Sequence, residues 1–186
     1  KKRGIPSSEI AVLFRTNVEA RALAETFMEY NMPFRMKERM PNLYEHFIAQ
    51  DLITYLKMAL GDRSRKSFLA IMNRPNRYIG LDRIDQLEVD FRILKNMAPY
   101  GAIQYIRKHI GYDEFLKEYA AFRKINMEDL KEVLREIEER TKAFRTIEEW
   151  FTHIEEYSEE LKRQSQQKET DPEAITFMTM HGSKGL

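Results

Sequence analysis

A long run of purely helical periodicity separates two short segments of strand-type sequence. Residues 9–14 and 174–180 are apolar runs bounded by polar or proline-containing sequence, a pattern typical of strands buried on both faces in a parallel sheet. Between them, residues 43–165 carry apolar side chains at helical spacing. Two or three strands with one helix do not make a stable parallel sheet. We therefore expect part of a larger α/β protein, interrupted by a helical insertion of about 120 residues.

The segment after the first predicted strand completes a β–α–β unit. Asn17 is expected to cap a helix that ends near Asn31 and Pro33, and residues 34–37 follow as a second strand. Strands joined through a helix run parallel, so the unit predicts a parallel sheet.

The helical insertion contains start and stop signals of its own. Gly61 is expected to end the first long helix, and Asn126 is expected to begin another. Thr146 and Glu149 have the spacing of a capping box, in which each side chain bonds the other residue's backbone amide. These signals predict several separate helices.

The sequence between residues 112 and 171 contains neither Gly nor Pro, and we expect two long helices there. Trp150, Phe151 and Tyr157 recur at helical spacing, which favours a core stripe over a surface that contacts a partner. Residues 164–170 are polar and are expected to form a linker.

The formal net charge of +1 conceals an asymmetry along the chain. The first 112 residues have a net charge of +7, whereas residues 113–163 have a net charge of −5. Residues 62–83 alone contribute six basic and two acidic side chains. A polyanionic partner is therefore expected to bind the first half, the alternative being an ordinary solvated surface.

Several classes of protein are excluded or disfavoured by composition. The chain has no Cys, which excludes disulfide scaffolds, thiol nucleophiles and zinc–thiolate sites. No uncharged apolar stretch reaches the length of a membrane span, and no apolar segment follows the basic residues 1–3. No His, Asp and Glu cluster has metal-ligand spacing. We expect a cytoplasmic protein without a membrane partner.

Two glycines and a lysine follow the last apolar run, at residues 179–186. Ligands of α/β sheets bind beyond the carboxyl ends of the strands, where glycines let the backbone approach a phosphate. The alternative is an ordinary strand-to-helix turn. The segment lacks the Gly-x-x-x-x-Gly-Lys-Ser/Thr spacing, so it is not a P-loop.

Three segments resemble elements of one helicase family. Residues 177–186 resemble motif V of the superfamily 1A DNA helicases, the UvrD/PcrA/Rep group. Residues 10–17, followed by Arg21 and residues 32–34, are similar to motif IVa and the helix and strand after it. Residues 75–80 resemble the Pro-x-Arg-Gly-Ile-Gly element of the family's 2B domain.

The resemblance implies a mixed, mostly α fold class. An all-helical 2B-type insertion would be flanked by pieces of a RecA-like α/β parallel-sheet domain. Residues 1–40 would form the first part of that RecA-like domain, called 2A, and residues 41–171 the 2B subdomain. Residues 172–186 would return to 2A and end in motif V.

The resemblance also implies roles for individual residues. It implies single-stranded DNA contacts at Arg15, Asn17, Thr179 and His181. It implies duplex contacts at Arg77, Tyr78, Ile79 and Gly80, and coupling to the nucleotide cleft at Lys184 and Gly185. Asn17 could also act only as a helix cap. Tyr78 stands where the family usually has Gly, so its side chain would either crowd a phosphate or stack on a sugar or base.

The function implied is that of a fragment of an ATP-dependent 3′-to-5′ DNA helicase. The full-length protein would use ATP and Mg²⁺, and its partners would be single-stranded DNA, the junction with duplex, and the remaining domains of the same chain. This chain has no Walker A or Walker B segment, so by itself it is expected to bind no cofactor and to be inactive. The alternative is a non-catalytic helical module that binds DNA or protein.

Overall fold

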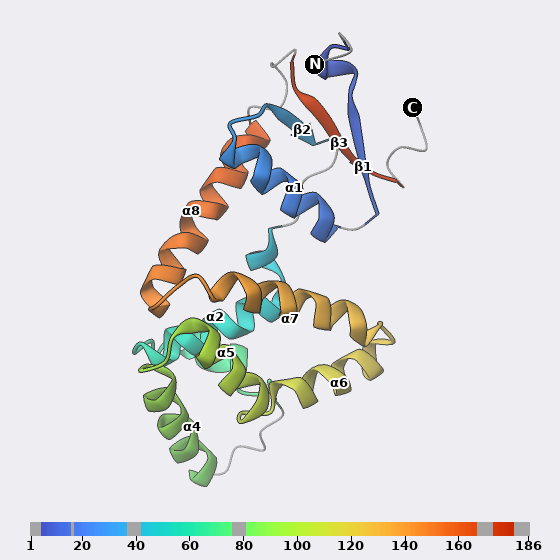
Figure 1. Cartoon of the computed structure of the whole chain (residues 1–186). Coiled ribbons are helices and arrows are strands. Elements are labelled where there is room, and N and C mark those ends of the chain that lie inside the picture. Colours follow the sequence, from blue (N-terminus) through green and yellow to red (C-terminus); the bar gives the residue numbers. More distant parts are fainter. Residues whose placement is uncertain (1–4, 16, 37–41, 76–80, 167–172, 181–186) are drawn as a thin grey trace. The chain divides into compact units, whose positions relative to one another are not determined.

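The computed structural model describes residues 5–15, 17–36, 42–75, 81–166 and 173–180. The chain divides into two compact units: Lys1–Asn42 with Glu155–Leu186, and Leu43–Ile154. The first contains the strands and the second is helical, so the mixed, mostly α fold class is confirmed (Figure 1).

The first unit is built on a three-stranded parallel sheet. Its strands are β1 (Ala11–Phe14), β2 (Phe34–Met36) and β3 (Ile175–Thr179), in the spatial order β1-β3-β2. The predicted parallel arrangement is confirmed. The strand from the far end of the sequence lies between the two early strands, as Figure 1 shows, so β1 and β2 do not pair with each other.

Helix α1 (Asn17–Glu29) and one face of the sheet form an aromatic core. Phe177, on the central strand, is fully buried, and its ring lies 4.9 Å from that of Phe34 and 5.3 Å from that of Phe14. The Phe27 ring of α1 is 4.9 Å from Phe177 as well. One side chain therefore joins all three strands and the helix.

Three sequence-based expectations for this unit are wrong in detail. The first strand is not buried on both faces: Phe14 is buried, but Leu13 is 49% exposed, because α1 packs on the face to which Phe14 points. The start of the expected strand is instead a 3-10 turn, η1 (Ser7–Glu9). Asn17 is the first residue of α1, so the predicted N-cap lies one position inside the helix.

The second unit is a helical bundle centred on α2. Its elements are η2 (Leu43–Glu45), α2 (Phe47–Ala59), α3 (Arg65–Ile71), α4 (Leu81–Leu94), α5 (Pro99–Lys108), α6 (Tyr112–Arg123), α7 (Met127–Thr141) and the first half of α8 (Ile147–Gln166). Helix α2 contacts α3, α4, α5 and α7, and its Leu52 and Leu56 are fully buried. Trp150 is also fully buried, as predicted.

The sequence signals that predicted a helix end at Gly61 and helix starts at Asn126 and Thr146 are confirmed. Gly61 has a positive φ of 113° just after α2, a conformation that glycine adopts without strain. The Asn126 side chain accepts a bond from the Glu128 amide at 3.0 Å and caps α7. The capping box of α8 is present: the Glu149 amide donates to Thr146 Oγ1 at 3.1 Å, and the Thr146 amide donates to Glu149 Oε2 at 3.2 Å.

The number and length of the later helices differ from the prediction. Residues 112–166 contain three helices, because α6 ends at Lys124 in the left-handed conformation, with φ 54°. Glycine usually takes this conformation at the end of a helix. Because Lys124 takes it here, the sequence contains no glycine that would predict the break. The polar residues expected to begin a linker at Gln164 instead continue α8 through Gln166.

Candidate nucleic-acid interface

The carboxyl ends of β1 and β3 meet at one edge of the sheet. Phe14 and Thr179, the last residues of the two strands, are register partners. The Met180 amide donates to the Phe14 carbonyl at 2.9 Å and extends the pairing by one bond. This edge is where α/β sheets bind their ligands.

Predicted residues from both ends of the sequence lie at this edge. Arg15 follows β1 with an exposed side chain, while its backbone amide donates to Glu19 Oε2 in the first turn of α1 at 3.1 Å. Thr179 is half-buried, and Met180 beside it is 56% exposed. Asn17 opens α1 directly after the edge. The edge thus combines an exposed guanidinium with the amino end of a helix, and both favour an anion.

The other predicted site residues lie outside the described part of the chain. They are Arg77, Tyr78, Ile79, Gly80, His181, Lys184 and Gly185.

Two cations of the basic segment, residues 62–83, form ion pairs with acids of the helical unit. Arg63 forms an ion pair with Glu88 at 3.0 Å, and its guanidinium lies 5.5 Å from the centre of the Phe91 ring. Arg74 forms an ion pair with Asp51 at 2.5 Å. Arg65 and Lys66 are exposed on α3. Counting charges along the sequence therefore overstates the positive charge that this segment presents to solvent.

Asp51 is a buried acid that the sequence analysis did not single out. It is 3% exposed, and its two carboxylate oxygens accept from Arg74 and, at 2.7 Å, from the Tyr112 hydroxyl. Burial raises the pKa of Asp51 above its ordinary value, and the bonds from Tyr112 and Arg74 only partly offset that effect. The available signal was a single acid in the mostly apolar sequence of α2.

A second cluster of charges joins three helices of the same unit. Arg107 of α5 bonds Asp113 of α6 at 2.8 Å and also bonds Glu138 of α7. Burial opposes the charge on Arg107, but its bonds to Asp113 and Glu138 outweigh burial and raise the pKa of the guanidinium. The cluster thus joins α5, α6 and α7 through ion pairs.

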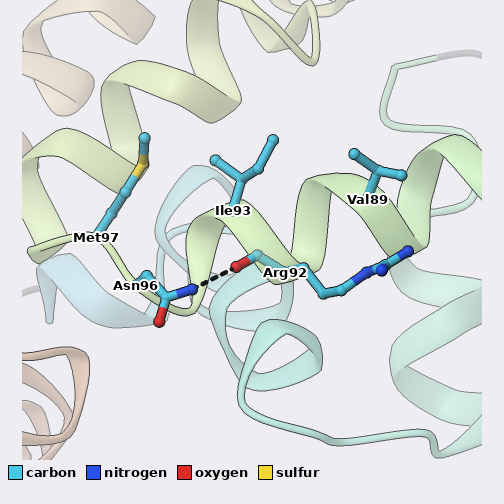
Figure 2. A pocket seen from close by; sticks show the side chains of 5 residues that line it. All are labelled: Val89, Arg92, Ile93, Asn96 and Met97. Carbon is cyan, nitrogen blue, oxygen red and sulfur yellow. Dashed lines mark hydrogen bonds between the residues drawn. The ribbon is translucent and has the colours of Figure 1, made fainter.

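Helix α4 carries an open depression of about 540 Å³ (Figure 2). Five side chains line it: Val89, Arg92, Ile93, Asn96 and Met97. Asn96 donates to the Arg92 carbonyl at 2.9 Å. None of these five described residues is an acid or a nucleophile.

Within the described ranges, no group of three or more His, Cys, Asp or Glu side chains has an arrangement suited to a metal ion. Among the described helices, none is both long and apolar enough to cross a membrane.

Comparison with known proteins decides the family. A family model described as the UvrD-like helicase C-terminal domain matches residues 1–167. The chain belongs to the UvrD-like helicase family. The predicted resemblance to UvrD/PcrA-type helicases is therefore confirmed.

The relatives of this UvrD-like chain are considerably longer than it is. The ATP-dependent DNA helicase PcrA of Staphylococcus epidermidis is 26% identical over 224 aligned residues, which cover all of this chain and 30% of that protein. The ATP-dependent DNA helicase PcrA of Staphylococcus aureus is 24% identical over 225 aligned residues, with the same coverage. The chain thus spans about 30% of the length of these curated relatives.

Proposed function

We propose that this chain is part of an ATP-dependent DNA helicase that moves 3′ to 5′ along single-stranded DNA and unwinds duplex. Its relatives named PcrA are ATP-dependent DNA helicases and match it over its whole length. The observation that carries the proposal is the parallel pairing of Phe14 with Thr179, because it gathers polar residues of two distant segments at the ligand-binding edge of an α/β sheet.

In this proposal, residues 1–40 and 172–186 belong to the RecA-like domain 2A, and residues 41–171 form the 2B subdomain. The single strand is bound by Arg15, Asn17, Thr179 and His181. The exposed guanidinium of Arg15 supplies a charge-assisted bond to a phosphate, and the threonine hydroxyl supplies a neutral one. Phosphate contacts of this kind fix position without reading sequence, as a protein that moves along DNA requires.

Residues 77–80 contact the duplex, and Lys184 and Gly185 couple the DNA edge to the nucleotide cleft. ATP and Mg²⁺ bind with the help of domains outside this chain. The sequence supplies no P-loop, so the remaining part of the helicase provides the phosphate cradle and the metal ligands.

The test is single-strand binding by the 186-residue chain, measured by fluorescence anisotropy for the wild type, Arg15→Ala and Arg35→Ala. Arg35 is a matched control, because it is an exposed arginine of the same sheet. It pairs with Thr176, three residues and therefore about 10 Å before Thr179 along β3. We expect Arg15→Ala to weaken binding about 10- to 100-fold, the typical effect of losing one charge-assisted bond, and Arg35→Ala to have little effect. Equal effects of the two substitutions would reject the proposed edge.

A further inference from the structure

Two side chains of the helical unit bond one loop residue, Arg74, and a third side chain bonds one of those two. The Tyr55 hydroxyl of α2 donates to the Arg74 carbonyl at 2.9 Å. The Arg74 guanidinium bonds Asp51 of α2, and the Tyr112 hydroxyl of α6 donates to the other oxygen of the same carboxylate at 2.7 Å. Both the backbone and the side chain of Arg74 are therefore held.

The next residue of the loop, Pro75, lies near the start of α6. A Cβ atom built on Gly111, at the start of α6, would lie 4.0 Å from Pro75 Cγ. Gly111 has a positive φ of 90° and leads directly into Tyr112. The start of α6 thus contributes a hydroxyl donor to the Asp51 carboxylate and lies near Pro75.

Because Asp51 is buried, the stability of its ionised form depends on the groups that bond it. An uncompensated charge at a site that is 3% exposed would be strongly destabilising, so Arg74 and Tyr112 must stay in place while Asp51 is ionised. An apolar side chain could fill such a site without this requirement, and buried ion pairs often give no net stability. The main effect of the bonds among Asp51, Arg74 and Tyr112 is therefore to fix the position of Arg74, and their net contribution to stability is small.

We propose that Asp51, Tyr55 and Tyr112 are positioning residues that fix Arg74 and thereby set the start of the duplex-binding element at residues 77–80. The inference rests on the proposed duplex role of that element, and it assigns Arg74 an inward, structural function. Only two residues separate Arg74 from Arg77, so a displaced anchor changes where the element begins. The Arg74 guanidinium bonds Asp51 through Nη1, so its role in this proposal is to hold the loop.

The test compares Tyr55→Phe and Tyr112→Phe with the control Tyr105→Phe in the 186-residue chain. Each substitution removes one hydroxyl. The Tyr105 hydroxyl also donates to a carboxylate, Asp90 Oδ1, at 3.0 Å, but it does not touch the Arg74 loop. The measurements are duplex and single-strand affinity by anisotropy, the thermal midpoint, and amide exchange at Arg74, whose amide donates to the Ile71 carbonyl at 3.0 Å.

We expect Tyr55→Phe and Tyr112→Phe to weaken duplex binding about 3- to 10-fold, the range for losing one buried hydrogen bond, with unchanged single-strand affinity. Exchange at Arg74 should accelerate in both variants, and Tyr105→Phe should change neither quantity. A lower thermal midpoint in all three variants with unchanged duplex affinity would overturn the inference, because the hydroxyls would then be merely structural.

Asp51→Asn and Asp51→Ala provide a rescue comparison. Asn retains the shape of the side chain and an acceptor for Tyr112, so we expect it to restore part of the duplex affinity that Ala loses. Equal losses in the two variants would contradict a positioning role. If Arg77→Glu leaves wild-type duplex affinity unchanged, the proposed duplex role fails. If Arg77→Glu weakens binding and the tyrosine variants do not, only the anchoring inference fails.

Discussion

Phe14 and Thr179 end their strands as register partners, and the Met180 amide bonds the Phe14 carbonyl at 2.9 Å. The whole helical unit lies between these two residues in the sequence. The candidate DNA edge is therefore assembled only when the far end of the chain returns between β1 and β2. Its integrity depends on the packing of β3.

Phe177→Ala is expected to disrupt the first unit and leave the helical unit folded. The fully buried ring contacts three other phenylalanine rings, and such truncations typically cost about 3–5 kcal/mol. Amide exchange of β3 should accelerate strongly. Fluorescence of Trp150, the single tryptophan and a core residue of the helical unit, should keep its urea midpoint. Phe122→Ala is the control, since Phe122 is 82% exposed. A parallel loss of the Trp150 transition would show that the two units do not unfold separately.

Thr146→Ala is expected to destabilise the helical unit by about 1 kcal/mol, the usual effect of losing a helix cap. The Thr146 hydroxyl accepts the Glu149 amide at 3.1 Å at the start of α8. Thr152→Ala is a matched control on the exposed side of the same helix, where the hydroxyl only donates to the Glu148 carbonyl. Urea unfolding followed by Trp150 fluorescence measures both. Equal effects would mean that helix propensity, and not the cap, sets the difference.

Features that depend on neighbouring residues were predictable from the sequence. The caps at Asn126 and Thr146 and the stop at Gly61 each involve groups within a few residues of one another, so their spacing is visible in one dimension. The core position of Trp150 follows in the same way from helical periodicity.

Features that depend on distant partners were not predictable. No local pattern indicates that β3 inserts between β1 and β2, because parallel pairing is set by the packing of the whole sheet. Arg63 and Arg74 look like available cations in the sequence, but their acidic partners, Glu88 and Asp51, are more than twenty residues away. The end of α6 at Lys124 was also missed, since a non-glycine residue takes the left-handed conformation there.

The pH dependence of stability should reveal the state of Asp51. Its raised pKa means that the folded protein holds this proton more tightly than the unfolded chain does. Between the ordinary value of about 3.9 and the raised value, the folded state binds more protons, so this group's contribution falls as pH rises. The Asp51→Asn variant has no group at this position that gains or loses a proton in this pH range. The stability of the wild type relative to Asp51→Asn should therefore decline as the pH rises above about 3.9, and level off once the pH passes the raised pKa.

Urea unfolding of both proteins across that range is the measurement. The groups that bond Asp51 are Arg74 and Tyr112. If the Arg74 ion pair outweighed burial, the pKa would be lowered and the relative stability would rise with pH. A rising difference would thus reverse the assignment of burial as the dominant cause.

The 186-residue chain is expected to show no DNA-stimulated ATP hydrolysis. Its sequence contains no Gly-x-x-x-x-Gly-Lys-Ser/Thr segment, so it has no loop whose amides would hold the ATP phosphates. Phosphate release with and without single-stranded DNA is the measurement. A variant with Lys184→Ala controls for contaminating ATPases, since background activity would not depend on it. Turnover that disappears in this variant would contradict the view that the rest of the helicase is needed for hydrolysis.

Duplex binding by the same chain should be weak and strongly dependent on salt. With Arg63 and Arg74 engaged in ion pairs, four cations of the basic segment remain, and three or four phosphate contacts correspond to a log–log salt slope of about −3. Arg77→Glu should weaken binding and make this slope shallower by about one, because one phosphate contact is lost. Arg135→Glu applies the same charge change to an exposed residue of α7, where Arg135 pairs with Glu128 at 2.8 Å. It should alter affinity little. Anisotropy titrations of the two variants at two or more salt concentrations are the measurement. Equal weakening by both charge reversals would mean that binding follows net charge alone and that residues 77–80 are not the duplex contact.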